Sequence, residues 1–163
     1  MALSAVRISR SVSDAIRAHC VQDYPAECCG LVTECPEGHQ QVWRCRNIQD
    51  DLHQRDPRAH PRTSRTAYRM DDMEVQRVLR DTELAGSRLA AFYHSHIDCD
   101  AYFSREDRVA AMFAEEPTFP GVSYLVFSIH EGRVGNQVAF RHDDSARTFI
   151  RVPLISEDRP GTV

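Results

Sequence analysis

Two histidines lie one residue apart in the segment "YHSHIDCDAYFSRED", residues 93–107. Residues i and i+2 of an extended strand point to the same side, so His94 and His96 can present two imidazoles to one point while Ser95 faces away. Imidazole nitrogens are frequent metal ligands. An H-x-H pair alone also fits the end of an ordinary strand, so a metal site requires further ligands.

Ser104 and Asp107 follow the histidines at a spacing that has two interpretations. S-x-x-D before an apolar helical pattern is a capping arrangement, in which the serine hydroxyl accepts a hydrogen bond from a backbone N–H and the aspartate lies in the positive first turn. Capping does not prevent the same carboxylate from pointing back at the end of the strand. His94, His96 and Asp107 then form a ligand triad, and three protein ligands leave one zinc position open for water, as in catalytic sites.

The elements on either side of these residues must position them. The run "LAAFY", residues 89–93, is short and continuously apolar, which predicts a strand buried on both faces that leads directly into His94. A helix is predicted to follow Ser104 and to end at Pro117. Its apolar side consists of Val109, Met112 and Phe113.

Two further helices are predicted from residue spacing. In residues 13–24 apolar side chains recur every four positions, and Pro25 ends the pattern. The second helix begins at a D-x-x-E cap formed by Asp71 and Glu74, and Gly86 stops it.

Several other segments are rich in apolar and β-branched residues and are bounded by turn residues, which predicts strands. The loops "PEGHQ" and "HEGR" each join two of them, and this hairpin spacing favours antiparallel neighbours. The predicted strands are residues 28–35, 41–48, 122–129, 134–140 and about 146–154.

Residues 49–67 contain almost no large apolar side chains but two prolines and many charges, which predicts a long surface loop. His53 and His60 lie in this segment and are interpreted as solvated side chains. Because long loops often carry function, we expect the substrate-binding surface here.

Length and composition are those of one water-soluble domain. The chain has 163 residues, of which 42% are hydrophobic and 27% charged, and its formal charge is −4. No cluster of Lys and Arg interleaved with aromatic residues is present, so nucleic acid is not an expected partner. Charged residues interrupt the first 19 residues, and no stretch approaches the roughly 18 apolar residues of a membrane span, so we expect a cytoplasmic protein without a membrane partner.

Six cysteines without a secretion signal are expected to be reduced thiols, and the absence of a C-x-x-C pair argues against a four-cysteine zinc site. Asp98, Cys99 and Asp100 lie between the candidate ligands. They are candidate contacts of metal or substrate, although a polar loop at this place also serves solvation. Tyr93 is expected to pack rather than to take part in chemistry.

The string His94-x-His96-x7-Ser104-x2-Asp107 resembles the motif of the JAMM (MPN+) metallopeptidases, which has a glutamate upstream of H-x-H, seven residues and S-x-x-D. The segment "PAECCGLV", residues 25–32, is similar to the P-x-E-x-C-G segment of that family, and it makes Glu27 the upstream glutamate. The resemblance covers roughly residues 6–145. It implies an α/β MPN (JAMM) domain with a mixed, largely antiparallel sheet flanked by helices, in a cytidine-deaminase-like architecture. We expect a single domain over residues 1–155 and a flexible tail at 156–163.

The resemblance also implies a chemistry. The ligand triad is expected to hold one Zn²⁺ per chain, which makes a water molecule acidic enough to attack near neutral pH. Glu27 is expected to take that proton as general base and to pass it to the leaving amine. Ser104 is expected to donate its hydroxyl to the oxyanion that develops on the attacked carbonyl.

Departures from the family pattern narrow the range of expected substrates. Many eukaryotic deubiquitinating members have proline after the second histidine, where this chain has Ile97. They also carry extra domains and C-terminal helices, which we do not expect here. The chain looks like the short, free-standing prokaryotic type, whose substrates are ubiquitin-like sulfur-carrier proteins cleaved after their C-terminal Gly-Gly. A ubiquitin-like sulfur-carrier protein or its conjugate is therefore the expected partner, and a homodimer is a candidate assembly.

Other functions agree less well with these residues. A non-catalytic MPN scaffold that binds a ubiquitin-like partner is the alternative, although such relatives usually lack one or more ligands. A zinc deaminase would need H-x-E and P-C-x-x-C, and neither occurs in the chain. The H-E-x-x-H motif of thermolysin-like proteases is also absent.

Overall fold

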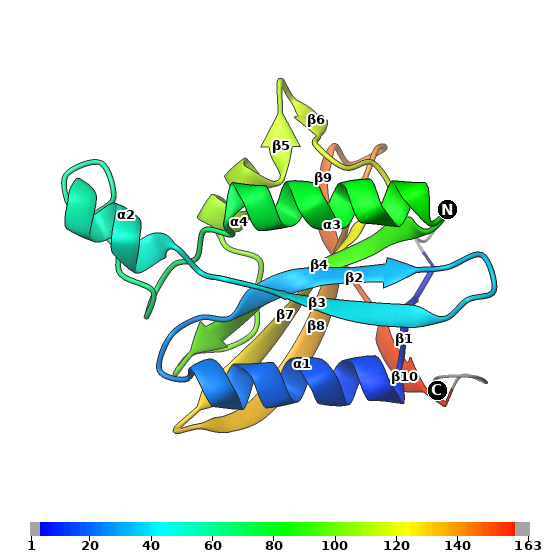
Figure 1. The fold of residues 1–163 in the computed structure, drawn as a ribbon, viewed down its shortest axis with the longest axis horizontal. Coiled ribbons are helices and arrows are strands. Elements are labelled where there is room, and N and C mark those ends of the chain that lie inside the picture. Colours follow the sequence, from blue (N-terminus) through cyan, green and yellow to red (C-terminus); the bar gives the residue numbers. More distant parts are fainter. Residues whose placement is uncertain (1–3, 159–163) are drawn as a thin grey trace.

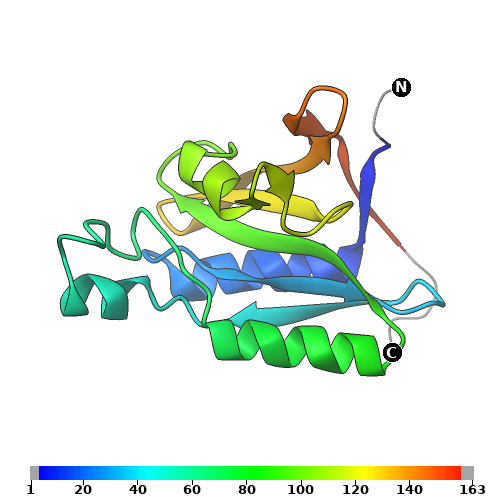
Figure 2. The same ribbon diagram turned by 90° about the horizontal axis from the view of Figure 1, so that it is seen from above.

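The computed structural model describes residues 4–158, which form a central six-stranded sheet covered by helices on both faces (Figures 1 and 2). Every neighbouring pair in the sheet is antiparallel except β4 and β7, which are parallel. The mixed, largely antiparallel sheet is therefore confirmed. In spatial order its strands are β3 (Gln40–Cys45), β2 (Cys29–Glu34), β4 (Arg88–Ile97), β7 (Ser123–His130), β8 (Arg133–Asp143) and β9 (Thr148–Val152).

Side-chain alternation along the central strands produces two cores, one on each face of the sheet. Tyr93 and Phe127 pack on the face covered by helix α1 (Arg10–Asp23). Phe92 and Val126 pack on the opposite face, together with residues of α3 (Asp72–Leu84) and of the segment around α4 (Arg105–Ala110). The predicted strand before His94 is thus buried on both faces, and it continues through both histidines to the end of β4.

Helices α1 and α3 confirm the two predictions made from residue spacing. Helix α1 begins earlier than predicted, after Ser9, whose hydroxyl accepts a hydrogen bond from the Val12 N–H. The Asp71 carboxylate caps α3 by accepting from the first backbone N–H groups of the helix. Glu74 does not complete a capping box, because its carboxylate accepts from the Arg46 N–H instead.

The prediction of a loop throughout residues 49–67 is wrong at its beginning, where α2 (Gln49–Arg55) forms. Asp50 and Asp51 lie in the first turn, where carboxylates are favourable to a helix N-terminus. Only Gln49 of this helix is buried, so the helix has no apolar stripe that residue spacing could reveal. The segment that follows, residues 56–70, has no regular secondary structure, and we call it the strap.

The prediction of a helix from Ser104 to Pro117 is also wrong in extent. Helix α4 ends at Ala110, and β5 (Met112–Phe113) pairs with β6 (Glu116–Pro117) in a small hairpin whose two turn residues have φ of +48° and +68°. Val109 and Phe113 are 67% and 76% exposed. The apolar spacing that predicted a longer helix therefore does not correspond to a buried face.

The predicted strand at about 146–154 is divided in two by Pro153. Proline cannot donate a ladder hydrogen bond, so β9 stops at Val152, and the chain continues as β10 (Leu154–Glu157), which pairs in parallel with β1 (Val6–Ser9). The first two residues of the predicted tail at 156–163 lie in β10, and residues 159–163 lie outside the described part. None of the described helices is both long and apolar enough to cross a membrane.

Candidate metal centre

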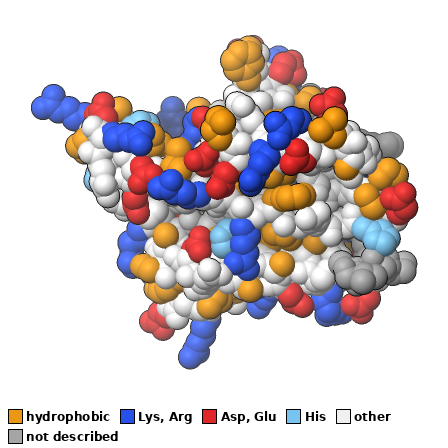
Figure 3. All heavy atoms as spheres, in the orientation of Figure 1, with side chains coloured by type: hydrophobic (Ala, Val, Ile, Leu, Met, Phe, Trp, Pro, Cys, Tyr) orange, Lys and Arg blue, Asp and Glu red, His pale blue; other side chains and the backbone are white. Residues whose placement is uncertain are grey.

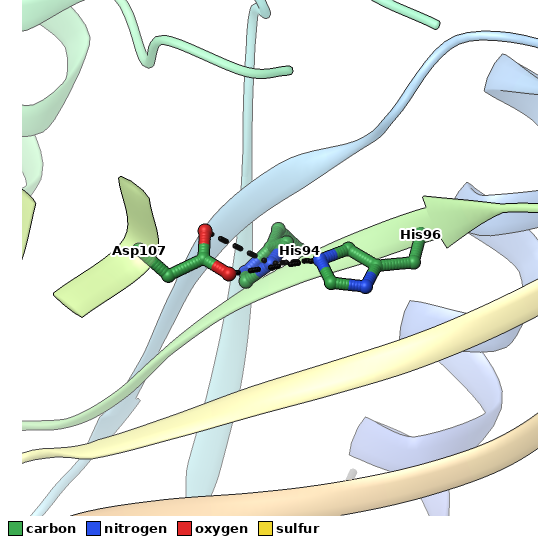
Figure 4. Close-up of side chains that lie close together, drawn as sticks. All are labelled: His94, His96 and Asp107. Atoms are coloured by element: carbon green, nitrogen blue, oxygen red, sulfur yellow. Dashed lines mark hydrogen bonds and ion pairs between the residues drawn. The ribbon is translucent and has the colours of Figure 1, made fainter. Parts of the chain in front are cut away.

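The ligand triad is formed where the end of β4 meets the first turn of α4 (Figure 4). His94 and His96 point to the same side of β4, and their Nε2 atoms lie 3.1 Å apart. The Asp107 carboxylate faces both, with Oδ1 3.4 Å from Nε2 of His94 and Oδ2 3.6 Å from Nε2 of His96. All three residues are buried, and their candidate ligand atoms lie within 4.8 Å of one another.

Asp107 performs both of the roles that its spacing from Ser104 allows. The Asp107 N–H donates to Ser104 Oγ at 3.0 Å, and the Ser104 N–H donates to Asp107 Oδ2 at 2.8 Å, which completes a capping box. The capping box fixes the side chain at the start of α4 while its carboxylate faces the histidines. Capping and the approach to the histidines are therefore two results of one side-chain position.

The electrostatics of the triad suit a divalent cation. Burial lowers the pKa of His94, which favours the neutral imidazole that binds metals. Burial alone would raise the pKa of Asp107, but its contacts with the two histidines and with Ser104 hold that pKa well below its usual range. Two imidazoles and one carboxylate that converge on one point are a donor set for Zn²⁺.

Neighbouring groups hold the rings of both histidines. Nδ1 of His96 donates to the Asp100 carbonyl oxygen at 3.2 Å, which leaves the Nε2 lone pair directed at the centre of the triad. Tyr68 stacks on His94 with ring centroids 4.4 Å apart, and Tyr102 meets His96 edge-on at 4.7 Å. Neither tyrosine was singled out from the sequence, because nothing in their spacing signals a contact with the histidines.

Glu27 lies between α1 and β2 and is only 5% exposed. It lines the same cleft as His96 and Asp107. Burial, and secondarily the charge of Asp107, raise the pKa of Glu27 to about 9. A carboxylate that holds its proton this firmly is a stronger base than an ordinary glutamate.

Two segments hold the backbone of Glu27 in place. Its N–H donates to the Ser64 carbonyl oxygen at 2.7 Å, and its carbonyl oxygen accepts from Nδ2 of Asn47 at 2.9 Å. Asn47 also donates to the carbonyl oxygen of Ala67, and Ser64 donates through its N–H and hydroxyl to Asp50. These polar residues were missed in the sequence, since an isolated Asn or Ser in a polar segment carries no recognisable spacing.

Gly30, the glycine of the E-x-C-G segment, explains how β2 can lie so close to β4. It pairs with Tyr93 in the register that also places Cys29 opposite His94. A Cβ atom at Gly30 would lie 2.3 Å from the Trp43 carbonyl oxygen and 2.5 Å from the Tyr93 hydroxyl. The Tyr93 hydroxyl bonds to Nδ1 of His19, on the far side of the sheet from the triad. Tyr93 is therefore a packing residue, as predicted.

Glu27 and two members of the triad, His96 and Asp107, line a cleft of about 530 Å³. One wall is the strap, which contributes Arg62, Arg65 and Tyr68. Cys99, Tyr102 and Glu106 also line the cleft. Ser104 also lines this cleft, so the structure brings together all five residues named from the sequence motif.

The other candidate residues named from the sequence are not part of the ligand triad. Asp98 accepts hydrogen bonds from Tyr24, Arg65 and the Glu131 N–H, and neither Asp98 nor Asp100 belongs to the ligand triad. Cys99 lines the cleft. His53 and His60 contact each other, through Nδ1 of His53 and the His60 carbonyl oxygen at 2.7 Å, and do not line the cleft. All six cysteines are free thiols.

Two solved structures share this fold. A protein from Desulfitobacterium hafniense matches 94% of this chain and 93% of its own with a TM-score of 0.68 and 20% sequence identity. A protein from Salinibacter ruber matches 99% of this chain and 95% of its own with a TM-score of 0.59 and 23% identity. At these identities the likeness concerns the fold alone.

Relatives with known activities are similar over most of the chain. The CysO-cysteine peptidase of Mycobacterium tuberculosis is 30% identical over 150 residues, which cover 92% of this chain and 91% of the relative. The desampylase of Haloferax volcanii is 28% identical over 137 residues, which cover 78% and 84% of the two chains. The family model described as prokaryotic homologs of the JAB domain matches residues 9–142, which include Glu27, Ser104 and the whole ligand triad. The chain therefore belongs to the prokaryotic JAB family, the short JAMM type that its motif resembles.

Proposed function

We propose that this protein is a zinc-dependent peptidase or isopeptidase that hydrolyses the bond after the C-terminal Gly-Gly of a ubiquitin-like sulfur-carrier protein. The observation that carries the proposal is the convergence of the three triad residues on one point, at a cleft that His96 and Asp107 share with the buried Glu27. The names of the relatives, a CysO-cysteine peptidase and a desampylase, support a hydrolase that acts on small ubiquitin-like proteins.

The ligand triad would hold one Zn²⁺. When bound, zinc acts as a Lewis acid that makes a water molecule acidic enough to attack a carbonyl near neutral pH. Glu27 takes the proton of the attacking water and passes it to the leaving amine. Its raised pKa makes its carboxylate a strong base, and the charge of a bound cation would lower that pKa.

Ser104 serves the developing oxyanion in this proposal. Its Oγ already accepts a hydrogen bond from the Asp107 N–H, so its hydroxyl hydrogen can be donated toward the cleft. A donor that is fixed before the reaction stabilises the transition state without reorganisation. Removal of one such donor commonly lowers kcat by about 100-fold or more.

Cleavage of defined substrates tests the proposal. Ubiquitin-like sulfur-carrier proteins that carry a C-terminal extension after Gly-Gly would be incubated with the zinc-loaded protein, with Glu27→Gln and with Glu83→Gln, a control at an exposed position of α3. Intact-mass analysis should show loss of the extension with the unmutated protein and the control, and not with Glu27→Gln. No cleavage by zinc-replete protein would contradict the peptidase and favour a non-catalytic scaffold.

The cellular location and the oligomeric state of the protein remain predictions. Cytoplasmic location and homodimer formation rest on the sequence alone. A sedimentation measurement of the purified protein would decide between monomer and dimer.

A further inference from the structure

The strap is the most basic segment beside the cleft. Residues 56–70 contain four arginines and one aspartate, in a chain whose formal charge is −4. Basic side chains gather on the surface formed by α2 and the strap, with acidic side chains among them (Figure 3). Of the four strap arginines, Arg62, Arg65 and Arg69 line the cleft, whereas Arg58 does not.

Backbone hydrogen bonds hold Arg62 in the cleft that Glu27 also lines. The Arg62 carbonyl oxygen accepts from Nε2 of the buried Gln49 at 2.8 Å. Two residues later, the Ser64 carbonyl oxygen accepts from the Glu27 N–H. The strap is therefore tied directly to the backbone of Glu27, and the positive charge of Arg62 opposes the burial-driven rise in the pKa of that carboxyl.

The present contacts of the Arg62 side chain are weak. Nη2 of Arg62 lies 3.4 Å from the Glu106 carboxylate, and the two side chains are 51% and 61% exposed. Nη1 of Arg62 donates to the Thr66 carbonyl oxygen, also at 3.4 Å. Exposed ion pairs of this kind contribute little free energy because water competes for both charges. Arg65 has a similar contact, at 3.3 Å, with Asp98. Both guanidinium groups can therefore exchange their present partner for a carboxylate that enters the cleft.

We propose that Arg62, with Arg65 beside it, binds the free α-carboxylate of the residue on the leaving side of the scissile bond. The enzyme then prefers to release one C-terminal amino acid rather than to open an isopeptide bond to an internal lysine. This inference rests on the proposed function and specifies its leaving group.

The geometry of a peptide restricts where that carboxylate can lie. The α-carboxyl carbon is two bonds from the scissile nitrogen, about 2.5 Å away, so it must bind beside the reacting groups. Arg62 shares the cleft with Glu27 and contacts the residue directly before Asp107, which places a guanidinium in this region. Guanidinium groups bind carboxylates through paired, charge-assisted hydrogen bonds.

The reaction is balanced by water alone. Water adds its oxygen to the glycine carbonyl carbon, and the bond between that carbon and the leaving nitrogen breaks. One product is the carrier with a C-terminal carboxylate. The other is a free amino acid whose nitrogen has received the proton carried by Glu27.

A matched set of substrates tests the proposal. A ubiquitin-like sulfur-carrier protein would be extended after Gly-Gly by one alanine, prepared once with a free C-terminal carboxylate and once as the C-terminal amide. We expect the zinc-loaded protein to cleave the acid at least about tenfold faster in kcat/KM, because a charge-assisted contact is lost with the amide. An extension of two alanines moves the carboxylate away and should lose most of this advantage.

Variants assign the preference to Arg62. Arg62→Gln should reduce the ratio of acid to amide cleavage toward one, Arg62→Lys should retain part of it, and Arg62→Glu should invert it. An inverted ratio cannot result from misfolding, which lowers both rates together. Glu106→Gln should raise the ratio because it removes the competing carboxylate, and Arg58→Gln, a strap control away from the cleft, should leave it unchanged.

Each contrary result has a distinct meaning. Equal cleavage of acid and amide by the unmutated protein would overturn the inference while leaving the peptidase intact. A loss of both rates in Arg58→Gln, with an unchanged ratio in Arg62→Gln, would assign the strap to an acidic surface of the carrier protein and would also overturn it. No cleavage of either substrate would contradict the proposed function and this inference with it.

Discussion

The ligand triad and the surroundings of Glu27 are built in different ways. The triad is assembled from local rules: the two-residue period of β4 aligns the histidines, and a capping box over residues 104–107 fixes Asp107. Glu27 is held by residues distant in sequence, Asn47 on one side and Ser64 of the strap on the other. The difference suggests that metal binding and proton transfer depend on separate parts of the molecule and can be altered separately.

The largest expected effect is the loss of the metal in Asp107→Asn. An amide is a neutral and weak ligand, so we expect zinc affinity to fall by more than the 10–100-fold that changes around a ligand typically cause, and activity to be abolished. Metal analysis of the purified protein measures this directly. The control is Glu106→Gln, one residue earlier in the same turn, which should keep one zinc per chain. Equal zinc content in Asp107→Asn and the unmutated protein would exclude Asp107 as a ligand.

Glu27→Gln should impair proton transfer while leaving metal binding unchanged. We expect zinc content to stay the same and kcat to fall by about 10²–10⁴-fold, the usual contribution of a general base. Metal analysis and cleavage of an extended carrier protein, performed on the same sample, measure both quantities. Loss of zinc together with activity would mean that Glu27 is a ligand, and the separation between the triad and Glu27 would be wrong.

In the metal-free protein, the free energy of unfolding should depend on pH because the Glu27 carboxyl group is buried. The folded-state pKa of about 9 lies above the usual value of 4.5, so the folded state retains a proton that the unfolded state has lost, and stability falls as pH rises between these values. The slope is at most about 1.4 kcal/mol per pH unit. Chemical denaturation between pH 6.5 and 8.5 with a chelator present measures it, and Glu27→Gln should flatten the slope. Parallel slopes for the two proteins would refute the assignment.

Asn47→Ala is expected to have the smallest effect. It removes the donors to the carbonyl oxygens of Glu27 and Ala67, which should cost about 1 to 2 kcal/mol of unfolding free energy and lower activity with zinc still bound. Urea denaturation, metal analysis and a cleavage assay together check this. An activity unchanged from the unmutated protein would show that the position of Glu27 does not depend on Asn47.

The difference between the locally assembled triad and the tertiary contacts of Glu27 also explains how much of the site could be predicted from the sequence. The positions of the two histidines and of Asp107 follow from strand period and capping, which act over a few residues. Glu27 was identified only through its resemblance to a family motif, because nothing local distinguishes it from a surface carboxylate. Arg62 and Ser64 lie in the strap, whose contacts are made by tertiary folding and leave no periodic pattern in the sequence.

The errors in the predicted fold have physical causes of the same kind. The helix after Ser104 was extended too far because Val109 and Phe113 match a helical spacing, although both are exposed in the structure. Strands β1 and β10 were missed because four-residue strands that pair across almost the whole chain carry little local signal. The antiparallel hairpins were predicted correctly, because short turns between apolar runs restrict how the strands can pair.

The most direct test of the metal site is a crystal structure of the zinc-loaded protein, with anomalous scattering data collected on both sides of the zinc absorption edge. We expect one zinc per chain, bound by Nε2 of His94, Nε2 of His96 and the carboxylate of Asp107. Glu27 should lie near the metal without coordinating it. An anomalous peak elsewhere, or a metal coordinated by Glu27 in place of one of these three residues, would contradict this assignment.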